Sequence, residues 1–282
     1  MTKRNDDIDQ APEHPDEMWA KKEFGLLLHR LQGLPAAARA RMQGRFAQQL
    51  VAETLSVETP RGPLSFVMLG QLAGGRGVTL LTKQPGTIAW IDAFRPNSVF
   101  WDVGANVGVY SLYAGLRGDL KVVAFEPAAV NYFVLSANCE VNGLEQQIDC
   151  LLVGLGSERA VARLEVSQFD PGRSFSFHKR PGLHGRGRQA AIILPMDRLI
   201  EEYELPCPNY IKIDTPGMLE AILAGGTRTL RRPDVREVHL EVRDGTRSGS
   251  RVEQLLTRSG FTVAGRHIHG GTADVTFVKA DA

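Results

Sequence analysis

Apolar residues recur along this chain in two alternating patterns, which together predict an α/β core. Between residues 99 and 243, short apolar runs of strand-like composition alternate with segments of helical period. Strands are expected at residues 99–103, 121–126, 148–153, 210–213 and 237–243. Helices are expected near residues 110–116, 129–142, 218–229 and 249–259. This alternation is typical of a doubly wound, mostly parallel sheet with helices on both faces.

Two further segments near the end of the chain have the pattern of paired strands. Residues 261–267 and 273–279 flank Gly270 and Gly271, which favours an antiparallel hairpin. The predicted fold is therefore α/β and Rossmann-like, with a doubly wound, mostly parallel sheet that an antiparallel hairpin closes. No internal repeat is visible in the sequence.

The residues before this core predict an N-terminal helical extension. Residues 1–16 are polar, contain prolines and lack periodicity, so we expect a disordered tail. Two helices follow, and Pro35 suits the first turn of the second one. Their apolar positions at helical spacing are Phe24, Leu27, Leu28 and Leu31, and then Met42, Phe46 and Leu50. Such a hairpin could pack against the main domain or a second subunit, or it could bind another partner or cap a substrate.

The remaining segments before the core are short. We expect two strands within residues 55–68, a glycine-rich loop at residues 70–77 and a short helix at residues 85–94. The expected domains are the tail at residues 1–16, the helical hairpin with the strand pair at residues 17–84, and a catalytic domain at residues 85–282.

Composition places this chain among ordinary globular proteins. Its 282 residues carry a formal charge of +1, with 43% hydrophobic and 23% charged residues. This balance gives no reason to expect binding to nucleic acid or to a membrane. The 3 cysteines are scattered, which argues against a disulfide framework or a zinc cluster. The chain has no secretory signal and no apolar run of the ~18 to 20 residues that a membrane helix needs, so we expect a cytoplasmic protein.

A glycine turn after the first core strand is the strongest candidate for a ligand site. Asp102 ends this strand, and the turn Gly104-Ala105-Asn106-Val107-Gly108 leads into a helix. This arrangement binds nucleotide-like ligands, because a backbone without Cβ atoms can approach the ligand closely. The spacing differs from the Gly-x-Gly-x-x-Gly of dinucleotide folds, which disfavours a nicotinamide-dependent oxidoreductase. The carboxylate of Asp102 and exposed amides suit a ligand that ends in an amino acid, as S-adenosylmethionine does.

The next predicted strand ends at Glu126, about 20 residues after the glycine turn. A carboxylate at this position can accept hydrogen bonds from both ribose hydroxyls of an adenosine. Asn131 either adds a hydrogen bond near the cofactor or caps the helix that follows Pro127. A capped strand end without any ligand is the alternative interpretation.

These residues resemble the FkbM-type methyltransferases. The resemblance covers roughly residues 85–242 and rests on four stretches of sequence. They are residues 85–92, residues 102–111, Phe125-Glu126-Pro127 with Asn131 and Asn138, and Ile211-Lys212-Ile213-Asp214. It implies a class I fold that binds S-adenosylmethionine and transfers methyl to a hydroxyl of a sugar or natural product. The expected cofactor-binding residues are Asp102, Gly104, Ala105, Asn106, Gly108, Glu126, Pro127 and Asn131.

Asp214 is the expected catalytic residue. It ends the fourth core strand and should meet Asp102 and Glu126 at the carboxyl edge of the sheet. A carboxylate there could orient the acceptor hydroxyl, take its proton or bind a divalent ion. The family pattern continues with two further acids, but this chain has Pro216 and Leu219 at those positions. We therefore predict no metal, and a catalytically impaired cofactor-binding protein that acts as an interaction module is the alternative function.

A basic segment at residues 173–188 could contribute to the acceptor site. It contains glycines, several arginines, His178 and His184, and either histidine could act as a base. Its cations could recognise a phosphate or carboxylate, or the segment could be a solvated loop. Glu241 could face the acceptor, and His239 is expected to be buried with a satisfied hydrogen bond. The expected partner is a small-molecule or glycan acceptor, for which an anionic group would suit, and the N-terminal helices could form a homo-oligomer.

Overall fold

The structure is a computed structural model that describes residues 15–165, 171–177, 189–215, 217–243, 246–269 and 271–279. Its contacts divide the chain into two compact units, Met1–Ala52 and Glu53–Ala282, which we describe separately. Of the expected tail, residues 1–14 lie outside the described residues, and residues 15 and 16 already belong to the first helix. No helix in the described ranges is long and apolar enough to cross a membrane.

The first unit is a helical hairpin, as the spacing of its apolar residues predicts. Helix α1 is Pro15–Gln32 and helix α2 is Ala36–Ala52. The carbonyl of Pro35 accepts a hydrogen bond from the amide of Arg39 (2.9 Å), which starts the second helix. Leu31 is the one buried apolar side chain among the described residues of this unit. Large apolar side chains on α1 are exposed, namely Met18, Trp19, Phe24, Leu26, Leu27 and Leu28.

The second unit is organised around a sheet of seven strands in the order β12-β13-β11-β10-β3-β4-β5. The strands in chain order are β3 (Ser98–Val103), β4 (Leu120–Phe125), β5 (Ile148–Leu151), β10 (Tyr210–Ile213), β11 (Glu237–Arg243), β12 (Phe261–His269) and β13 (Thr272–Lys279). Strand β13 pairs antiparallel with β11 and β12, and the other neighbours are parallel. The predicted parallel sheet with a closing hairpin is confirmed.

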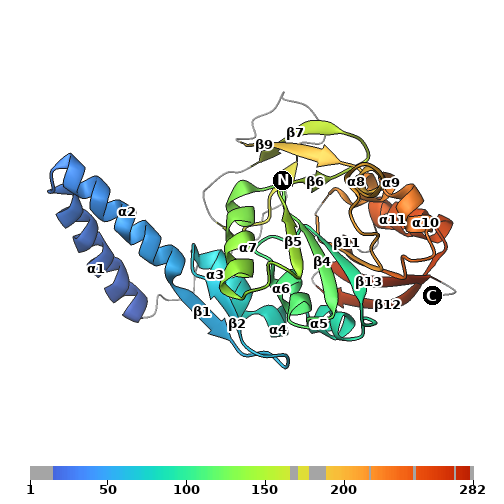
Figure 1. The fold of residues 1–282 in the computed structure, drawn as a ribbon, viewed down its shortest axis with the longest axis horizontal. Helices are drawn as coiled ribbons and strands as arrows, with labels where there is room; N and C mark the ends of the chain where they lie inside the picture. Colours follow the sequence, from blue (N-terminus) through green and yellow to red (C-terminus); the bar gives the residue numbers. More distant parts are fainter. Residues whose placement is uncertain are drawn as a thin grey trace. The chain divides into compact units, whose positions relative to one another are not determined.

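Helices cover both faces of this sheet. The face that carries Phe100 and Val122 packs against α5 (Pro85–Asp92), α6 (Val109–Gly115) and α7 (Ala129–Val141). The opposite face packs against α8 (Met196–Tyr203), α9 (Leu219–Ala224), α10 (Thr227–Arg231) and α11 (Arg247–Arg258). Figure 1 shows α7 and the group α9–α11 on opposite sides of β4 and β5. Successive residues of a strand therefore point into two different apolar cores. Because both faces are buried, most positions of these strands are apolar.

The single helix expected at residues 218–229 is in fact two helices, α9 and α10. Gly225 and Gly226 separate them. A Cβ atom at Gly225 would lie 1.9 Å from the carbonyl oxygen of Gly156, so the chain passes too close for any side chain. This backbone contact, which no local pattern shows, interrupts the helix.

The boundary between the two units lies at residue 52, whereas residue 84 was expected. Strands β1 (Thr54–Val57) and β2 (Leu64–Val67) form the expected antiparallel pair but belong to the second unit. Their amides explain this, because Ser65 donates to Asn142 Oδ1 (2.8 Å) and Val67 donates to Asn138 Oδ1 (2.7 Å). The strand pair is thereby tied to α7.

The loop expected at residues 70–77 was wrong, because residues 71–78 form a helix. Helix α3 is Gln71–Val78, and α4 (Leu80–Lys83) follows it directly. A Cβ atom at Gly77 would lie 2.7 Å from the ring of Phe66, and one at Gly74 would lie 2.5 Å from Met68. The glycines let the helix lie against β2, so packing outweighs their low helix propensity.

A second sheet connects β5 to β10, and the sequence analysis missed it. Its order is β6-β9-β7-β8, formed by Gly154–Leu155, Gln189–Leu194, Ala160–Glu165 and Ser176–Phe177. Figure 1 shows β7 and β9 of this sheet apart from the main strands. The sheet matters for function because it carries residues 171–177 to the carboxyl edge of the main sheet.

Candidate active site

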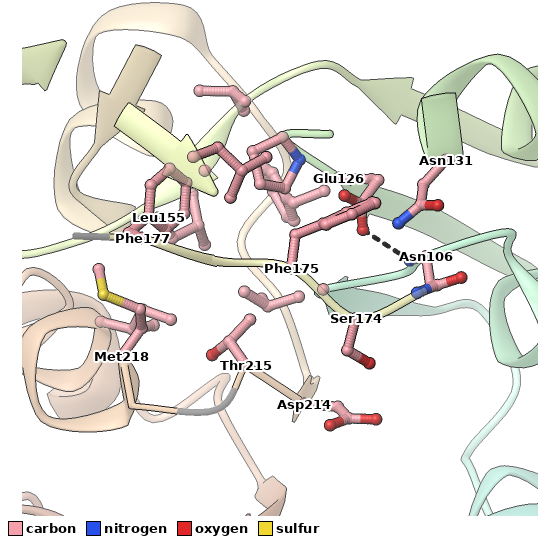
Figure 2. A pocket seen from close by; sticks show the side chains of 18 of the residues that line it. Asn106, Glu126, Asn131, Leu155, Ser174, Phe175, Phe177, Asp214, Thr215 and Met218 are labelled. Atoms are coloured by element: carbon pink, nitrogen blue, oxygen red, sulfur yellow. Dashed lines mark hydrogen bonds between the residues drawn. The ribbon is translucent and has the colours of Figure 1, made fainter. Parts of the chain in front are cut away.

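A cavity lies at the carboxyl ends of β3, β4 and β10. Figure 2 shows Asn106, Glu126 and Asn131 at one end of it and Leu155, Phe177 and Met218 at the other. Of the predicted site residues, it is lined by Gly104, Asn106, Glu126, Pro127, Asn131 and Asp214. The free space inside it is about 60 Å³.

The glycine turn shapes one wall of this cavity. The amides of Gly104 and Ala105 both donate to the carbonyl of Phe125 (2.9 and 3.0 Å), which ties the turn to β4. Gly104 has a φ of 83°, and a Cβ atom there would lie 2.5 Å from the carbonyl oxygen of Asp214. Only glycine combines this φ with so close an approach. The turn therefore brings the ends of β3, β4 and β10 together.

Glu126 presents a buried carboxylate to the cavity. Its Oε2 accepts from the amide of Asn106 (2.9 Å) and its Oε1 from the amide of Ala128 (2.8 Å). Burial raises the pKa of Glu126 to about 7, although these hydrogen bonds act in the opposite direction. Each oxygen keeps a lone pair for a further donor, so the carboxylate fits a pair of ribose hydroxyls.

Asn106 and Asn131 hold residues 171–177, a segment that we call the strap. The amide of Gly172 donates to Asn131 Oδ1 (2.9 Å). The side-chain amides of Asn131 and Asn106 both donate to the carbonyl of Arg173 (3.0 and 3.1 Å). The guanidinium of Arg76, on α3, donates to the carbonyl of Gly172 and to Ser174 Oγ (3.2 Å). Two predicted cofactor-binding side chains thus already bond to the protein's own backbone.

The strap also narrows the cavity. Ser174, Phe175 and Phe177 line it, and Figure 2 shows Phe175 between its two ends, beside Glu126. Pockets for nucleotide-sized ligands have volumes of about 300 to 1,000 Å³. Since the free space is about 60 Å³, such a ligand can enter only if residues that line the cavity move, and the strap supplies three of them.

Asp214 and the buried Lys212 form an ion pair at the end of β10. Lys212 Nζ lies 3.6 Å from Asp214 Oδ2, 3.9 Å from Asp102 Oδ1 and 4.7 Å from the ring centroid of Tyr110. Its side chain is 4% exposed, whereas that of Asp214 is 33% exposed. Lys212 thus balances two carboxylates, and only that of Asp214 reaches the cavity.

Asp102, Ala105 and Gly108 lie beneath the cavity and do not line it. Asp102 is fully buried, and Ser111 Oγ donates to its Oδ2 (2.6 Å). Its Oδ1 has no hydrogen bond within the described part of the chain. Burial raises the pKa of Asp102, and the cation of Lys212 opposes this. Gly108 directly precedes α6, and a Cβ atom there would lie 2.4 Å from Leu135.

The segment after Asp214 contributes no second carboxylate from its described residues. Pro216 lies outside them, and Leu219 begins α9. Glu220 accepts from Ser248 Oγ (2.6 Å) and lies 3.5 Å from Arg251 Nη1, so it points to other surface residues. Across the described ranges, no three side chains of His, Cys, Asp or Glu are grouped as metal ligands.

Of the three histidines considered in the sequence analysis, the structure describes only His239. His178 and His184 lie outside the described residues. His239 is buried, with its ring nitrogens 3.1 Å from Thr87 Oγ1 and 2.9 Å from Thr276 Oγ1. Burial lowers its pKa to about 3, so it is neutral, and the expected satisfied histidine is confirmed.

Sequence reasoning missed Arg76, Lys212 and the aromatic residues of the strap. The position of Lys212 between Ile211 and Ile213 in a buried strand could have indicated its ion pairs, because a buried cation requires acidic partners. Arg76 and Gly172 are 96 residues apart, and no local pattern pairs them.

Comparison with known proteins identifies the family of this chain. Residues 102–263 match the family described as Methyltransferase FkbM domain, a span of more than half of the chain. The chain belongs to this family. Its members are S-adenosylmethionine-dependent methyltransferases, so this chain is one as well, with S-adenosylmethionine as its cofactor. The predicted family and cofactor are confirmed.

Individual relatives are distant. The 31-O-demethyl-FK506 methyltransferase FkbM of Streptomyces tacrolimicus is 28% identical over 211 residues, which cover 62% of this chain and 80% of that protein. The hexuronic acid methyltransferase AglP of Haloferax volcanii is 28% identical over 154 residues, covering 54% of this chain and 60% of that protein. A solved SAM-dependent methyltransferase from Agrobacterium tumefaciens has a TM-score of 0.49 and 12% identity, covering 80% of this chain and 70% of that one.

Proposed function

We propose that this FkbM-family methyltransferase transfers methyl to a hydroxyl oxygen of a sugar, glycan or secondary metabolite. The observation that carries the proposal is that one cavity contains both Glu126 and Asp214. The carboxylate of Glu126 suits a ribose, and that of Asp214, which Lys212 holds, would meet an acceptor. The names of two relatives support it, since one is a 31-O-demethyl-FK506 methyltransferase and the other a hexuronic acid methyltransferase.

The residues of the cavity fit S-adenosylmethionine. The bare backbone at Gly104, where a Cβ atom would collide with Asp214, leaves no side chain between the turn and a ligand. Glu126 would accept the ribose hydroxyls, and the apolar residues Pro127, Leu155 and Phe177 would surround the adenine. Asp102, through Ser111 and Lys212, would hold the turn and the end of β10 in place. When bound, the cofactor supplies an electrophilic methyl group on a sulfonium.

Asp214 would orient the acceptor hydroxyl and receive its proton. Methyl transfer is an in-line displacement, in which the oxygen–carbon bond forms as the carbon–sulfur bond breaks. Positioning of the two reactants therefore supplies much of the acceleration. The acceptor proton must leave as well, and Asp214 is the carboxylate that the described part of the cavity offers near β10.

The position of Glu220 supports one alternative. Because Glu220 bonds to Ser248 and Arg251, the cavity has fewer acids than the family pattern leads one to expect. A chain with intact cofactor binding and no turnover would then be an interaction module, for which the exposed apolar residues of α1 provide a surface.

An assay with defined acceptors separates the two functions. The full chain is incubated with S-adenosylmethionine and nitrophenyl glycosides of neutral hexoses and of glucuronic acid, and S-adenosylhomocysteine release and the methylated product are measured. Methyl transfer to a hydroxyl that Asp214→Asn slows about 10²- to 10⁴-fold would support the enzyme. Tight binding of S-adenosylhomocysteine without transfer to any acceptor would favour the interaction module.

A further inference from the structure

A second cavity lies on the other side of β10 from the cofactor residues. The α4–α5 junction forms one wall with Lys83, Gln84, Pro85, Gly86 and Thr87. The sheet forms the other wall with His239 of β11, residues 265–267 of β12, and Asp274 and Thr276 of β13. Its free space is about 240 Å³, which is about eight times the ~30 Å³ that a water molecule occupies in the liquid. This volume suits one sugar ring.

The register of the strands places this cavity beside Asp214. Lys212, His239 and Thr276 are direct neighbours across β10, β11 and β13. Two residues further toward the carboxyl edge, Glu241 is opposite Asp274, and Asp274 is opposite His267. Asp214 follows Ile213, which pairs with Leu240, so it stands level with this second row. Polar side chains therefore extend from Asp214 along the sheet edge into the second cavity.

A chain of buried polar contacts also joins the two cavities. Lys212 lies beside Asp214 and over the ring of Tyr110. The hydroxyl of Tyr110 donates to Gln84 Oε1 (2.6 Å), and Gln84 Nε2 donates to Asp274 Oδ1 (3.4 Å). Gln84, Thr87 and His239 are themselves buried, so the floor of the second cavity is polar and fixed.

Lys83 is a cation that lines this cavity and whose side chain is exposed. Within the described residues it has neither a hydrogen bond nor an ion pair. Desolvation and the nearby cations of Arg76 and Lys212 lower the pKa of Lys83, while the carboxylates of Asp214 and Glu241 raise it. An ammonium group at the wall of a cavity, without a partner in the described part of the chain, can donate its hydrogen bonds to a ligand.

We propose that the second cavity holds the body of a polyhydroxylated acceptor, with Lys83 donating to its oxygens and its reactive hydroxyl directed toward Asp214. This subsite rests on the proposed O-methyltransferase function. Glu126, which would hold the ribose, follows β4, whereas Asp214 follows β10, so an acceptor that meets Asp214 would approach from the far side of β10. Lys83 is a specificity residue in this arrangement, because it contacts the acceptor body and not the transferred methyl.

The charges favour a neutral ring over an anionic one. Asp214, Glu241 and Asp274 stand in one row near Lys83, and Arg266, a second cation that lines the cavity, pairs with Glu253, so negative charges around the site offset its cations. Carboxylates accept hydrogen bonds from hydroxyls, and the ammonium donates to hydroxyl or ring oxygens. A ring with several hydroxyls satisfies both kinds of group, whereas a carboxylated ring would face the acidic row.

Ligand-observed NMR titrations test the subsite without turnover. The probes are methyl glycosides of glucose, galactose and mannose, together with methyl glucuronoside, added to the full chain saturated with S-adenosylhomocysteine. We expect saturable binding of at least one neutral glycoside, weakened about tenfold in Lys83→Met because a charged hydrogen bond is lost. Lys121→Met is the matched control, since Lys121 pairs with Asp149 at the start of β4 (2.9 Å).

Several results would overturn this subsite. They are binding in Lys83→Met that equals the wild type, an equal loss in Lys121→Met, or no saturable binding of any probe. Preferential binding of the glucuronoside that disappears in Lys83→Met would assign the cavity to a carboxylate instead. Failure of S-adenosylhomocysteine to bind the wild type, measured separately by calorimetry, would instead count against the proposed function, because the glycosides can also be titrated without it.

Discussion

The carboxylate of Glu126 is expected to make cofactor affinity depend on pH near neutrality. Burial raises its pKa to about 7 in the structure. A ribose diol donates two hydrogen bonds to the ionised form, whereas a protonated carboxyl group has one oxygen occupied by its own proton. Binding therefore favours the ionised form of Glu126 and releases a proton at pH values below this pKa.

The size of the effect follows from the pKa. With a pKa of about 7, roughly a tenth of Glu126 is ionised at pH 6 and roughly nine tenths at pH 8. A ligand that binds only the ionised form then gains about tenfold in affinity over this interval, or about 1.4 kcal/mol. In Glu126→Gln the profile should be flat, and affinity at pH 8 should fall about 10- to 100-fold, because charge-assisted hydrogen bonds are lost.

Calorimetric titration with S-adenosylhomocysteine at pH 6, 7 and 8 measures this affinity, and two buffers of different ionisation enthalpy report the proton release. Glu140→Gln is the control, since Glu140 is an exposed glutamate of α7. An affinity that does not change with pH in the wild type refutes the reasoning. So does the same slope in Glu126→Gln, because the titrating group would then lie elsewhere.

The same raised pKa predicts an opposite trend for stability without ligand. Between the usual value of 4.5 and about 7, the folded state retains a proton on Glu126 that the unfolded state has lost. The free energy of unfolding should therefore fall as pH rises through this window. Thermal unfolding of Glu126→Gln should lack this part of the pH dependence.

Three further substitutions test other parts of the site. Asp214→Asn should lower kcat about 10²- to 10⁴-fold while the Kd of S-adenosylhomocysteine stays about the same, and a parallel loss of binding would contradict a role at the acceptor. Gly104→Ala should lower Tm more than Gly118→Ala, because both glycines have positive φ but only Gly104 has a backbone oxygen 2.5 Å from the Cβ position. Equal losses would show that φ alone matters. Arg76→Met removes both side-chain hydrogen bonds to the strap and should raise the association rate of S-adenosylhomocysteine several-fold in stopped-flow measurements, since each bond contributes about 1 kcal/mol. An unchanged rate would show that the strap does not control entry.

The main sheet could be predicted because its strands are buried on both faces. Residues 99–103 and 121–126 read as continuous apolar runs, since alternate side chains enter one core or the other. The second sheet could not be predicted in this way. Strands β6 and β8 have two residues each, so neither one can show a period. The prediction of a loop in place of helix α3 was wrong for a related reason. The glycines of this helix are explained by its close contact with Met68 and Phe66, which lie outside the helix.

The part of the candidate site that lies at strand ends could be predicted from the sequence. Asp102, Glu126 and Asp214 each stand at the end of a strand, so the sequence placed them at one edge. The structure then distinguishes their roles, because Asp102 is fully buried whereas Glu126 and Asp214 line the cavity. The strap was unpredictable, since its bonds to Arg76, Asn106 and Asn131 join segments that are distant in sequence. Lys83 could not be predicted either, because only the fold shows that it has no partner among the described residues.

The departure from the family pattern after Asp214 narrows how this site can work. Glu220 is displaced by one position, and one residue turns a helix by about 100°. The structure shows the consequence, since Glu220 bonds to Ser248 on α11 and is directed to the surface. Asp214 is then the acid of this segment that is left for the acceptor, and Lys212 fixes its carboxylate from 3.6 Å away. A fixed carboxylate can align a hydroxyl with the sulfonium methyl, and alignment supplies a large share of the rate of an in-line displacement. The chain can therefore dispense with the second acid provided that the acceptor is held from its other side, which is the role that Lys83 and the second cavity would perform.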